Sequence, residues 1–267
     1  MKKNISCIVQ ARMGSSRLPG KILLTGYDKP LLIHLVERIK KSKKIDKVIV
    51  ATTNNKLDNI IFNLCKKNKI DVFRGDEKDV LTRYLACAKK FKTSTIVRIT
   101  SDCPLIDHQI IDDMLKKYEK GNYDFYGNTH PATFPDGYDI EIFSYEALKK
   151  SHFNVKNSFQ REHVTPYIWD NPKKFLIGNY KNKKKNYQNH YRLTLDFIED
   201  YYVIFFIYNN LYPKKKLFKF KDVINFLKNN KYILKINKKY IKVNWYSKHM
   251  SKLKTITNKD TKIIKKR

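Results

Sequence analysis

Three cationic side chains stand beside a Gly/Ser-rich turn near the start of the chain. They are Arg12, Arg17 and Lys21, in the segment QARMGSSRLPGKIL at residues 10–23. Together they can neutralise about three phosphate charges, and the Pro19-Gly20 turn brings the last of them back toward the others. Backbone N–H groups around Gly14, Ser15 and Ser16 can add an anion-binding nest. The pattern therefore predicts a phosphate-binding loop rather than a basic surface turn.

Spacing excludes two common phosphate-binding motifs. A Walker A motif has four residues between its glycines and ends in Lys followed by Ser or Thr. Here five residues separate Gly14 from Gly20, and Ile22 follows the lysine. The dinucleotide fingerprint G-x-G-x-x-G does not occur in the chain. The loop therefore belongs to another class of nucleotide-binding segment.

Two aspartates stand where apolar runs end, in positions that suit a divalent cation. Asp102 follows STIVRIT, and Asp196 closes RLTLD before a helical stretch. Mg²⁺ that accompanies a nucleoside triphosphate is held by one or two carboxylates together with phosphate oxygens. We therefore expect Asp102 to bind Mg²⁺. Asp196 is either a second ligand or the N-cap of the helix that follows it.

Buried strands and amphipathic helices alternate through the first half of the chain. Apolar runs predict strands at 5–10, 47–53, 71–75 and 94–100, and helical spacing predicts helices at 30–42, 56–68, 77–91 and 107–121. This alternation is typical of the α/β class, with a mainly parallel sheet covered on both faces. Ligands of such sheets bind beyond the carboxyl ends of the strands. That edge would bring together the opening loop, Arg74 and Asp102.

The second half of the chain is less regular. Strands are predicted at 138–143 and 190–196, and helices at 160–170 and 198–212. We expect the main α/β domain, which carries the phosphate-binding loop, over residues 1–213. A basic C-terminal extension over 214–267 would follow it, with one helix at 220–230 and a mobile tail.

The formal charge of +31 suggests that the protein binds nucleic acid, but the distribution of the charge argues against this. Only nine of the 56 Lys and Arg residues are Arg, and the lysines lie mostly in runs with Asn and Ile. Such runs indicate a biased composition and a solvated basic surface. Residues 180–191, YKNKKKNYQNHY, form the one stretch that interleaves aromatic and basic residues as single-strand binding requires. Nucleic-acid binding therefore stays a minor alternative.

Cysteine usage and hydropathy indicate a cytoplasmic protein. The four cysteines form no C-x-x-C pair, as expected of buried thiols in a reducing compartment. The apolar run in MKKNISCIVQ is too short for a signal peptide, and YYVIFFIYNNLY is too short to span a membrane. We expect no membrane insertion.

Six motifs together resemble the CMP-sugar-acid cytidylyltransferases, the family of the 3-deoxy-manno-octulosonate and acylneuraminate enzymes. They are QARMGSSRLPGKIL, VFRGDEKDVLTRY, VRITSDCPLID, DGYDIEIFSYEAL, REHVTPYI and RLTLDFIEDY, and they cover roughly residues 4–205. Within the family the chain is most similar to the SpsF branch of spore coat polysaccharide biosynthesis. The resemblance implies a Rossmann-like nucleotide-diphospho-sugar transferase fold of the GT-A type, in three α/β/α layers.

The resemblance places residues from three of these motifs in a nucleotide site. They are Ala11, Arg12, Gly14, Ser15, Ser16, Arg17, Lys21, Arg74 and Asp102, with Arg12, Lys21 and Asp102 in catalytic roles. Arg74 would lie near the base and ribose. Asp79 and Arg83 are four residues apart, so an intrahelical ion pair explains them equally well. Thr100 and Ser101 stand where the octulosonate enzymes carry Gln-Gly, which leaves the strictness of the CTP preference open.

Two further motifs, DGYDIEIF and REHVTPYIW, should shape the acceptor pocket. We select from them Asp139, Glu141, Arg161, Glu162 and His163 as substrate-binding residues. An arginine at 161 could hold an acceptor carboxylate through two parallel hydrogen bonds. His163 has the pKa range of a general base, but a structural histidine explains it equally well. We therefore assign it to the substrate site only.

The expected reaction is transfer of CMP from CTP to a nonulosonic- or octulosonic-type sugar acid, with release of pyrophosphate. Mg²⁺ is the expected cofactor, and related enzymes pair through the second half of the fold, which implies a homodimer. A metal-dependent glycosyltransferase on the same architecture is the first alternative. A D-x-D motif would favour it, and the chain has SDCP there instead. A nucleic-acid-binding protein is the second alternative.

Overall fold

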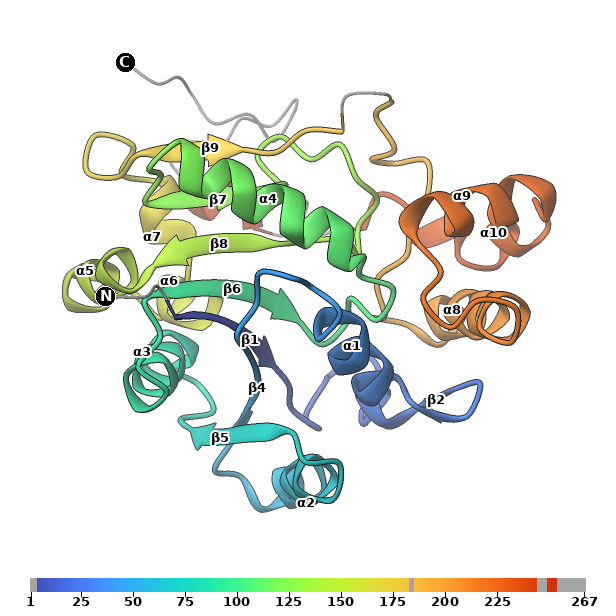
Figure 1. Ribbon diagram of the computed structural model, residues 1–267, viewed down its shortest axis with the longest axis horizontal. Coiled ribbons are helices and arrows are strands. Elements are labelled where there is room, and N and C mark those ends of the chain that lie inside the picture. The colour runs from blue at the N-terminus through green and yellow to red at the C-terminus, as the bar shows by residue number, and fades with distance from the viewer. Residues whose placement is uncertain (1–3, 183–184, 244–248, 254–267) are drawn as a thin grey trace.

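The site is built on a seven-stranded sheet whose strands lie in the order β5-β4-β1-β6-β8-β7-β9 (Figure 1). The computed structural model describes residues 4–182, 185–243 and 249–253. The strands are β1 Ile5–Gln10, β4 Lys47–Thr53, β5 Asp71–Gly75, β6 Thr95–Thr100, β7 Phe125–Gly127, β8 Glu141–Ser144 and β9 Ile177–Asn179. A separate small hairpin pairs β2 Thr25–Gly26 with β3 Lys29–Pro30. The four strands predicted in the first half are confirmed.

The register brings the ends of the central strands level with one another. Strands β5, β4, β1 and β6 are parallel, and Gln10 pairs with both Ala51 and Thr100. The chain therefore leaves β1 and β6 at the same edge of the sheet. Strand β8 runs antiparallel to β6, with Glu141 opposite Arg98, so β8 begins near that edge.

Helices cover both faces of the sheet. They are α1 Leu31–Ile39, α2 Asn59–Lys67, α3 Val80–Lys90, α4 His108–Lys120, α5 Tyr145–Asn154, α6 Ser158–His163, α7 Pro166–Trp169, α8 Ile198–Leu211, α9 Phe220–Asn229 and α10 Ile233–Ile236. Alternate residues of a strand point to opposite faces. Cys7 and Val9 accordingly join a core cluster with α1, α4, α8 and α9, whereas Ile8 joins a second cluster with α3, α5 and α7. The expected three-layer α/β/α class is confirmed.

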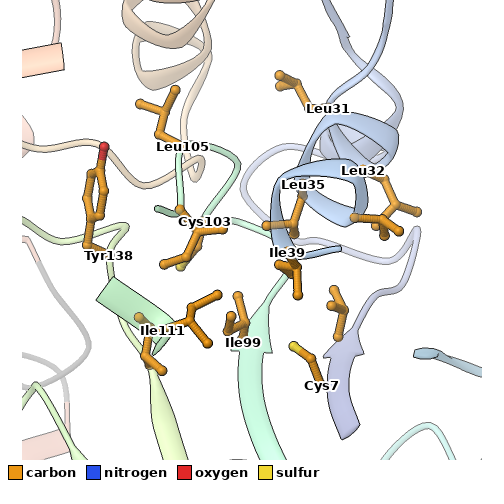
Figure 2. Packing of buried hydrophobic residues seen from close by; sticks show 14 of the residues in the cluster. Cys7, Leu31, Leu32, Leu35, Ile39, Ile99, Cys103, Leu105, Ile111 and Tyr138 are labelled. Atoms are coloured by element: carbon orange, nitrogen blue, oxygen red, sulfur yellow. The ribbon is translucent and has the colours of Figure 1, made fainter. Parts of the chain in front are cut away.

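Helix α1 shows how the larger cluster is packed (Figure 2). Its Leu35 and Ile39 lie toward Cys7 of β1 and Ile99 of β6, and all four side chains are buried. Burying each such side chain stabilises the fold by about 1.5–3 kcal/mol. This packing fixes β1 and β6, and with them the loops that follow.

The predicted cap and end of α4 and the predicted burial of the cysteines are confirmed. Asp107 caps α4 by accepting a hydrogen bond from the Gln109 N–H, and Gly121 ends the helix. The four cysteines are buried free thiols. None of the helices in the described ranges combines the length and hydropathy that crossing a bilayer requires.

Two elements predicted in the second half of the chain do not form as expected, and a third is shifted along the chain. Residues 190–196 make no strand, because the Leu193 and Leu195 N–H groups donate to the loop carbonyls of Asp136 and Asp102. The predicted helix at 160–170 is divided into α6 and α7, since Val164 adopts a φ of 71°. The strand expected at 138–143 forms later and shorter, as β8.

The described part of the C-terminal segment contains two α-helices, α9 and α10, where one was expected. Its side chains Phe218, Val223, Leu227 and Ile233 are buried in the larger core cluster. The domain division at residue 213 stays a prediction. The expected mobile tail lies largely outside the described residues.

Candidate active site

A cavity of about 440 Å³ opens at the edge of the sheet where β1 and β6 end. Most of the predicted site residues line it: Ala11, Arg12, Ser15, Ser16, Arg17, Lys21, Asp102, Asp139, Glu141, Glu162, His163 and Asp196. Gly14, Arg74 and Arg161 do not. The structure therefore unites residues from the opening loop, from β6 and from the irregular second half.

The opening loop is held by its own hydrogen bonds. The Met13 carbonyl accepts from the Ser15 and Gly20 N–H groups at 2.8 and 3.0 Å, and Gly20 adopts a φ of 68°. The Ser15 amide is therefore engaged, and the nest expected there is wrong at that position. Among the described residues, the N–H groups of Gly14 and Ser16 donate to no protein acceptor. Those two amides are available to an anion.

Lys21 lies between the two aspartates that were predicted as metal ligands. Its Nζ is 2.9 Å from Asp196 Oδ1 and 3.7 Å from Asp102 Oδ2, and the residue is only 9% exposed. Arg17 also forms an ion pair with Asp196. Both carboxylates therefore face the same small volume.

Asp196 is not the N-cap of α8, a position that Phe197 occupies, and its role as a metal ligand stays a prediction. The Asp200 carboxylate accepts hydrogen bonds from the Asp196 and Phe197 N–H groups, each at 3.1 Å. Burial acts to raise the pKa of Asp196, but the charge of Lys21 and the hydrogen bond from Arg17 outweigh it and lower the pKa to about 2. The Asp196 side chain is thus an ionised carboxylate aimed at the cavity cations.

Arg192, a buried arginine that the sequence analysis did not select, forms ion pairs with Asp196 and with two neighbouring aspartates. Arg192 pairs with Asp200 at 2.9 Å, with Asp136 at 3.1 Å and with Asp196 at 3.3 Å. Asn237 donates to Asp200 and to the Arg192 carbonyl, which ties the C-terminal segment to the site. Burial raises the pKa of Asp136 to about 7 despite the charge of Arg192. The feature of the sequence that could have pointed to Arg192 is the rarity of arginine in this lysine-rich chain.

Arg98 of β6 also lines the cavity and was not predicted as a site residue. Its guanidinium donates to the Gln10 side chain at 3.0 and 3.2 Å and pairs with Glu141. Glu141 also accepts a 2.8 Å hydrogen bond from the Thr165 hydroxyl. Glu141 is therefore neutralised within the protein.

Arg74 and Arg161, predicted as ligand-binding residues, do not line the cavity, and both donate to the protein itself. Arg74 donates to the Thr53 and Asn55 carbonyls, each at 2.8 Å, and thereby fixes the connection after β4. Arg161 pairs with Asp79 at 2.7 Å and donates to the Val155 carbonyl at 3.1 Å. Neither guanidinium faces the cavity.

The intrahelical ion pair of Asp79 with Arg83, one of the two explanations that the sequence left open for these residues, does not form. Asp79 caps α3 by accepting from the Thr82 N–H at 2.9 Å, while Arg83 donates to the Asp76 carbonyl. A capping carboxylate turns toward the start of its helix, so it does not reach a side chain one turn later.

His163 lines the cavity as a neutral aromatic group. Its ring lies 4.7 Å from that of Phe159 and 5.0 Å from that of His249, measured between centroids. Burial, and then the neighbouring His249, lower the pKa of His163 to about 3. A group with such a pKa is a weak base, which supports a role in shaping the pocket.

Residues 6–255 match the profile of a family described as cytidylyltransferase. The chain belongs to this cytidylyltransferase family. It is therefore a nucleotidyltransferase, as the resemblance of its motifs implied. This assignment weighs against both alternatives, glycosyl transfer and nucleic-acid binding.

The chain is similar to two curated proteins over most of their length. The chain is 40% identical over 232 residues to a Methanocaldococcus jannaschii protein named only as uncharacterized, covering 86% of this chain and 93% of that one. It is 34% identical over 203 residues to the Bacillus subtilis spore coat polysaccharide biosynthesis protein SpsF, covering 74% and 83%. The predicted similarity to the SpsF branch is confirmed.

Solved structures share the architecture. A cytidylyltransferase from Leptospira borgpetersenii superimposes with a TM-score of 0.81 at 38% identity, covering 87% of this chain and 97% of that one. The CTP complex of CMP:2-keto-3-deoxy-manno-octonic acid synthetase gives 0.52 at 16% identity, covering 67% and 90%. At that identity the second likeness concerns the fold alone.

Proposed function

We propose that the chain transfers CMP from CTP to a hydroxyl group of a sugar acid and releases pyrophosphate, for surface polysaccharide or glycan synthesis. The observation that carries this proposal is the placement of Lys21 between Asp102 and Asp196, inside a cavity lined by Arg12 and Arg17. A triphosphate needs cations for its leaving group and carboxylates for its metal, and this cavity offers both.

The opening loop would hold the β- and γ-phosphates of CTP. Arg12 is an exposed side chain on the cavity wall, and Arg17 lies beside it in the same loop. The amides of Gly14 and Ser16 add two uncharged donors. In nucleotidyl transfer, such groups stabilise the charge that develops on the departing pyrophosphate. No protein nucleophile is required.

Asp102 and Asp196 fit a divalent cation by the chemistry of their donor atoms. Both present carboxylate oxygens within reach of one ammonium, and Asp196 is ionised at neutral pH. A protein of the same fold, Rv0371C of Mycobacterium tuberculosis, has been solved in complex with manganese. We propose Mg²⁺ here, held by these two residues and by phosphate oxygens. When bound, it supplies charge neutralisation and lowers the pKa of the attacking hydroxyl group.

Lining residues from the later part of the chain would bind the acceptor. Asp139, Glu141, Glu162 and His163 line the cavity, together with Thr129 and Trp169. Relatives that are 28–30% identical over part of the chain are named 3-deoxy-manno-octulosonate cytidylyltransferases, which supports a sugar acid. The expected homodimer and the cytoplasmic location stay predictions.

Pyrophosphate release tests the proposal. Purified protein would be given Mg²⁺, each of the four nucleoside triphosphates and a panel of sugar acids, beside Asp102→Ala. Release that requires CTP, one acid and Asp102 is expected. Equal release with every triphosphate would contradict the CTP preference. Silence with all pairings, together with binding of a nucleotide sugar, would contradict nucleotidyl transfer.

A further inference from the structure

The two carboxylate oxygens of Asp196 have different surroundings. Oδ1 pairs with Lys21 at 2.9 Å and with Arg17, and both of these cations line the cavity. Oδ2 lies 3.3 Å from the buried guanidinium of Arg192. One oxygen is therefore held within the protein, while the other is presented to the cavity cations. The orientation of the Asp196 carboxylate thus depends on Arg192.

All three guanidinium nitrogens of Arg192 donate to the protein. Their acceptors are the carboxylates of Asp200, Asp136 and Asp196 and the carbonyl of Val243. Arg192 is 2% exposed, and lysine has no planar set of donors that could make these contacts. Arg192 therefore supports the site from behind and is not itself a ligand for substrate.

Asp200 extends this support to the backbone that carries Asp196. Its Oδ2 accepts hydrogen bonds from the Asp196 and Phe197 N–H groups, each at 3.1 Å. Asp200 is fully buried and pairs with Arg192 at 2.9 Å. A buried ion pair keeps its geometry where further hydrogen bonds satisfy the atoms that the pair leaves over. The Arg192–Asp200 pair therefore needs additional partners.

The C-terminal segment supplies those partners. Asn237 is 3% exposed, and its side-chain amide donates to Asp200 Oδ1 at 2.9 Å and to the Arg192 carbonyl at 3.0 Å. The Val243 carbonyl accepts from Arg192 Nη1, and Val243 also lines the cavity. Residues far along the chain thus reach Asp196 through a single intermediate pair.

Tyr240 makes an independent contact with the same place. Its ring stacks on that of Phe197, with centroids 3.9 Å apart and planes 6° from parallel. The guanidinium groups of Arg17 and Arg192 each lie 5.6 Å from the centre of the Phe197 ring. Phe197 directly follows Asp196, so the stack restrains the backbone beside the carboxylate.

We infer that residues 237–243 are part of the active site, and that Asn237 is a positioning residue for the transfer reaction. Asn237 fixes the Arg192–Asp200 pair, and this pair holds the Asp196 carboxylate in the orientation that binds the metal ion. The inference rests on the proposed function, because it assumes the role proposed there for Asp196. It gives a part in catalysis to a segment that carries none of the motifs of the resemblance.

Binding of a CTP analogue with and without Mn²⁺ tests the inference. The analogue has methylene between the α- and β-phosphorus atoms, so that no transfer occurs, and calorimetry gives its Kd in each condition. The ratio of the two Kd values measures how much the metal site contributes. Asn237→Leu removes the amide donors at nearly constant volume, and we expect this ratio to fall by about fivefold or more. Binding without metal should stay within about twofold of the wild type.

Matched variants separate positioning from stability. Leu227→Ala also weakens the C-terminal segment, but Leu227 belongs to the apolar core, so the ratio should not change. Tyr240→Ala should lower the ratio by about twofold or more, whereas Tyr240→Phe keeps the stack and should preserve it. Tyr240 is only half-buried, so this pair of variants is available if Asn237→Leu fails to fold.

Four results would overturn the inference. They are an unchanged ratio in every folded variant of Asn237 and Tyr240, an equal loss of binding with and without Mn²⁺, an equal fall of the ratio in Leu227→Ala, and a wild-type protein whose analogue binding does not respond to Mn²⁺. Failure of the proposed function would show separately, as an absence of pyrophosphate release from CTP by the wild type with every acceptor.

Discussion

At the scale of single residues, the arginines are the most informative guide to where the fold places its buried polar contacts. Where a lysine-rich sequence keeps an arginine, the position favours a planar group of several donors. Arg98 and Arg192 fit this expectation, because they pair with the carboxylates of Glu141 and Asp200. The sequence indicated where such donors are required, but not what they bind. Arg74 and Arg161 illustrate the limit, because their targets are backbone carbonyls that only the folded chain brings near.

Lys21 should be the most sensitive cation of the site. Lys21→Met removes the charge that lies between Asp102 and Asp196, which leaves both carboxylates without their ammonium. We expect kcat/KM to fall by about 100-fold or more, because stabilisation of the leaving group is lost. Pyrophosphate release would measure it, beside Lys116→Met on an exposed face of α4. Activity within about threefold of the wild type would contradict the assigned role.

Arg161 should matter for stability rather than for the acceptor. Arg161→Ala leaves the Val155 carbonyl and Asp79 without their donor, at a cost of about 1–2 kcal/mol. Urea unfolding should show this loss, whereas the KM of the acceptor should stay within about twofold. A rise of KM with unchanged stability would restore Arg161 to the substrate site.

At the scale of elements, apolar runs predicted the strands that are buried on both faces. The run at residues 190–196 resembles those strands, yet its backbone hydrogen bonds go to loops at Asp102 and Asp136. No local pattern reveals such long-range partners. The interruption between α6 and α7 at Val164 could not be predicted for a related reason. Tertiary packing imposes a φ there that a β-branched residue rarely adopts.

The start of α3 gives a pH-dependent prediction at this scale. Burial acts to raise the pKa of Asp79, but the Thr82 hydrogen bonds and Arg161 lower it overall. A carboxyl whose pKa is lower in the folded state stabilises the fold above its unfolded pKa and loses this effect as the pH falls. Asp79→Asn keeps a capping oxygen and removes the charge. Its deficit in unfolding free energy should be largest at pH 7 and should shrink below about pH 4; a deficit that does not change with pH would contradict the ion pair.

At the scale of the whole molecule, the C-terminal segment is joined to the rest through packing and through Asn237. Leu227 of α9 is fully buried in the same core cluster as β1 and α1. The sequence analysis separated this segment because it carries none of the motifs of the resemblance, and contacts with the core cannot be deduced from composition.

Leu227→Ala tests whether the segment folds with the remainder. We expect a loss of about 2–5 kcal/mol in one cooperative transition of the whole chain. Lys228→Ala, on the exposed side of the same helix, is the matched control. Two separate transitions, with only the weaker one affected, would indicate an independent C-terminal unit.

Transfer of the α-phosphorus is the central claim, and isotopic labelling measures it directly. The wild-type protein and Asp102→Asn would be given Mg²⁺, an acceptor and CTP labelled with ³²P at the α or the γ position. We predict that the α label appears in the sugar product and the γ label in pyrophosphate, and that Asp102→Asn abolishes both. Transfer of the γ label to the acceptor, or an α label that stays in free nucleotides while the acceptor is consumed, would contradict the account.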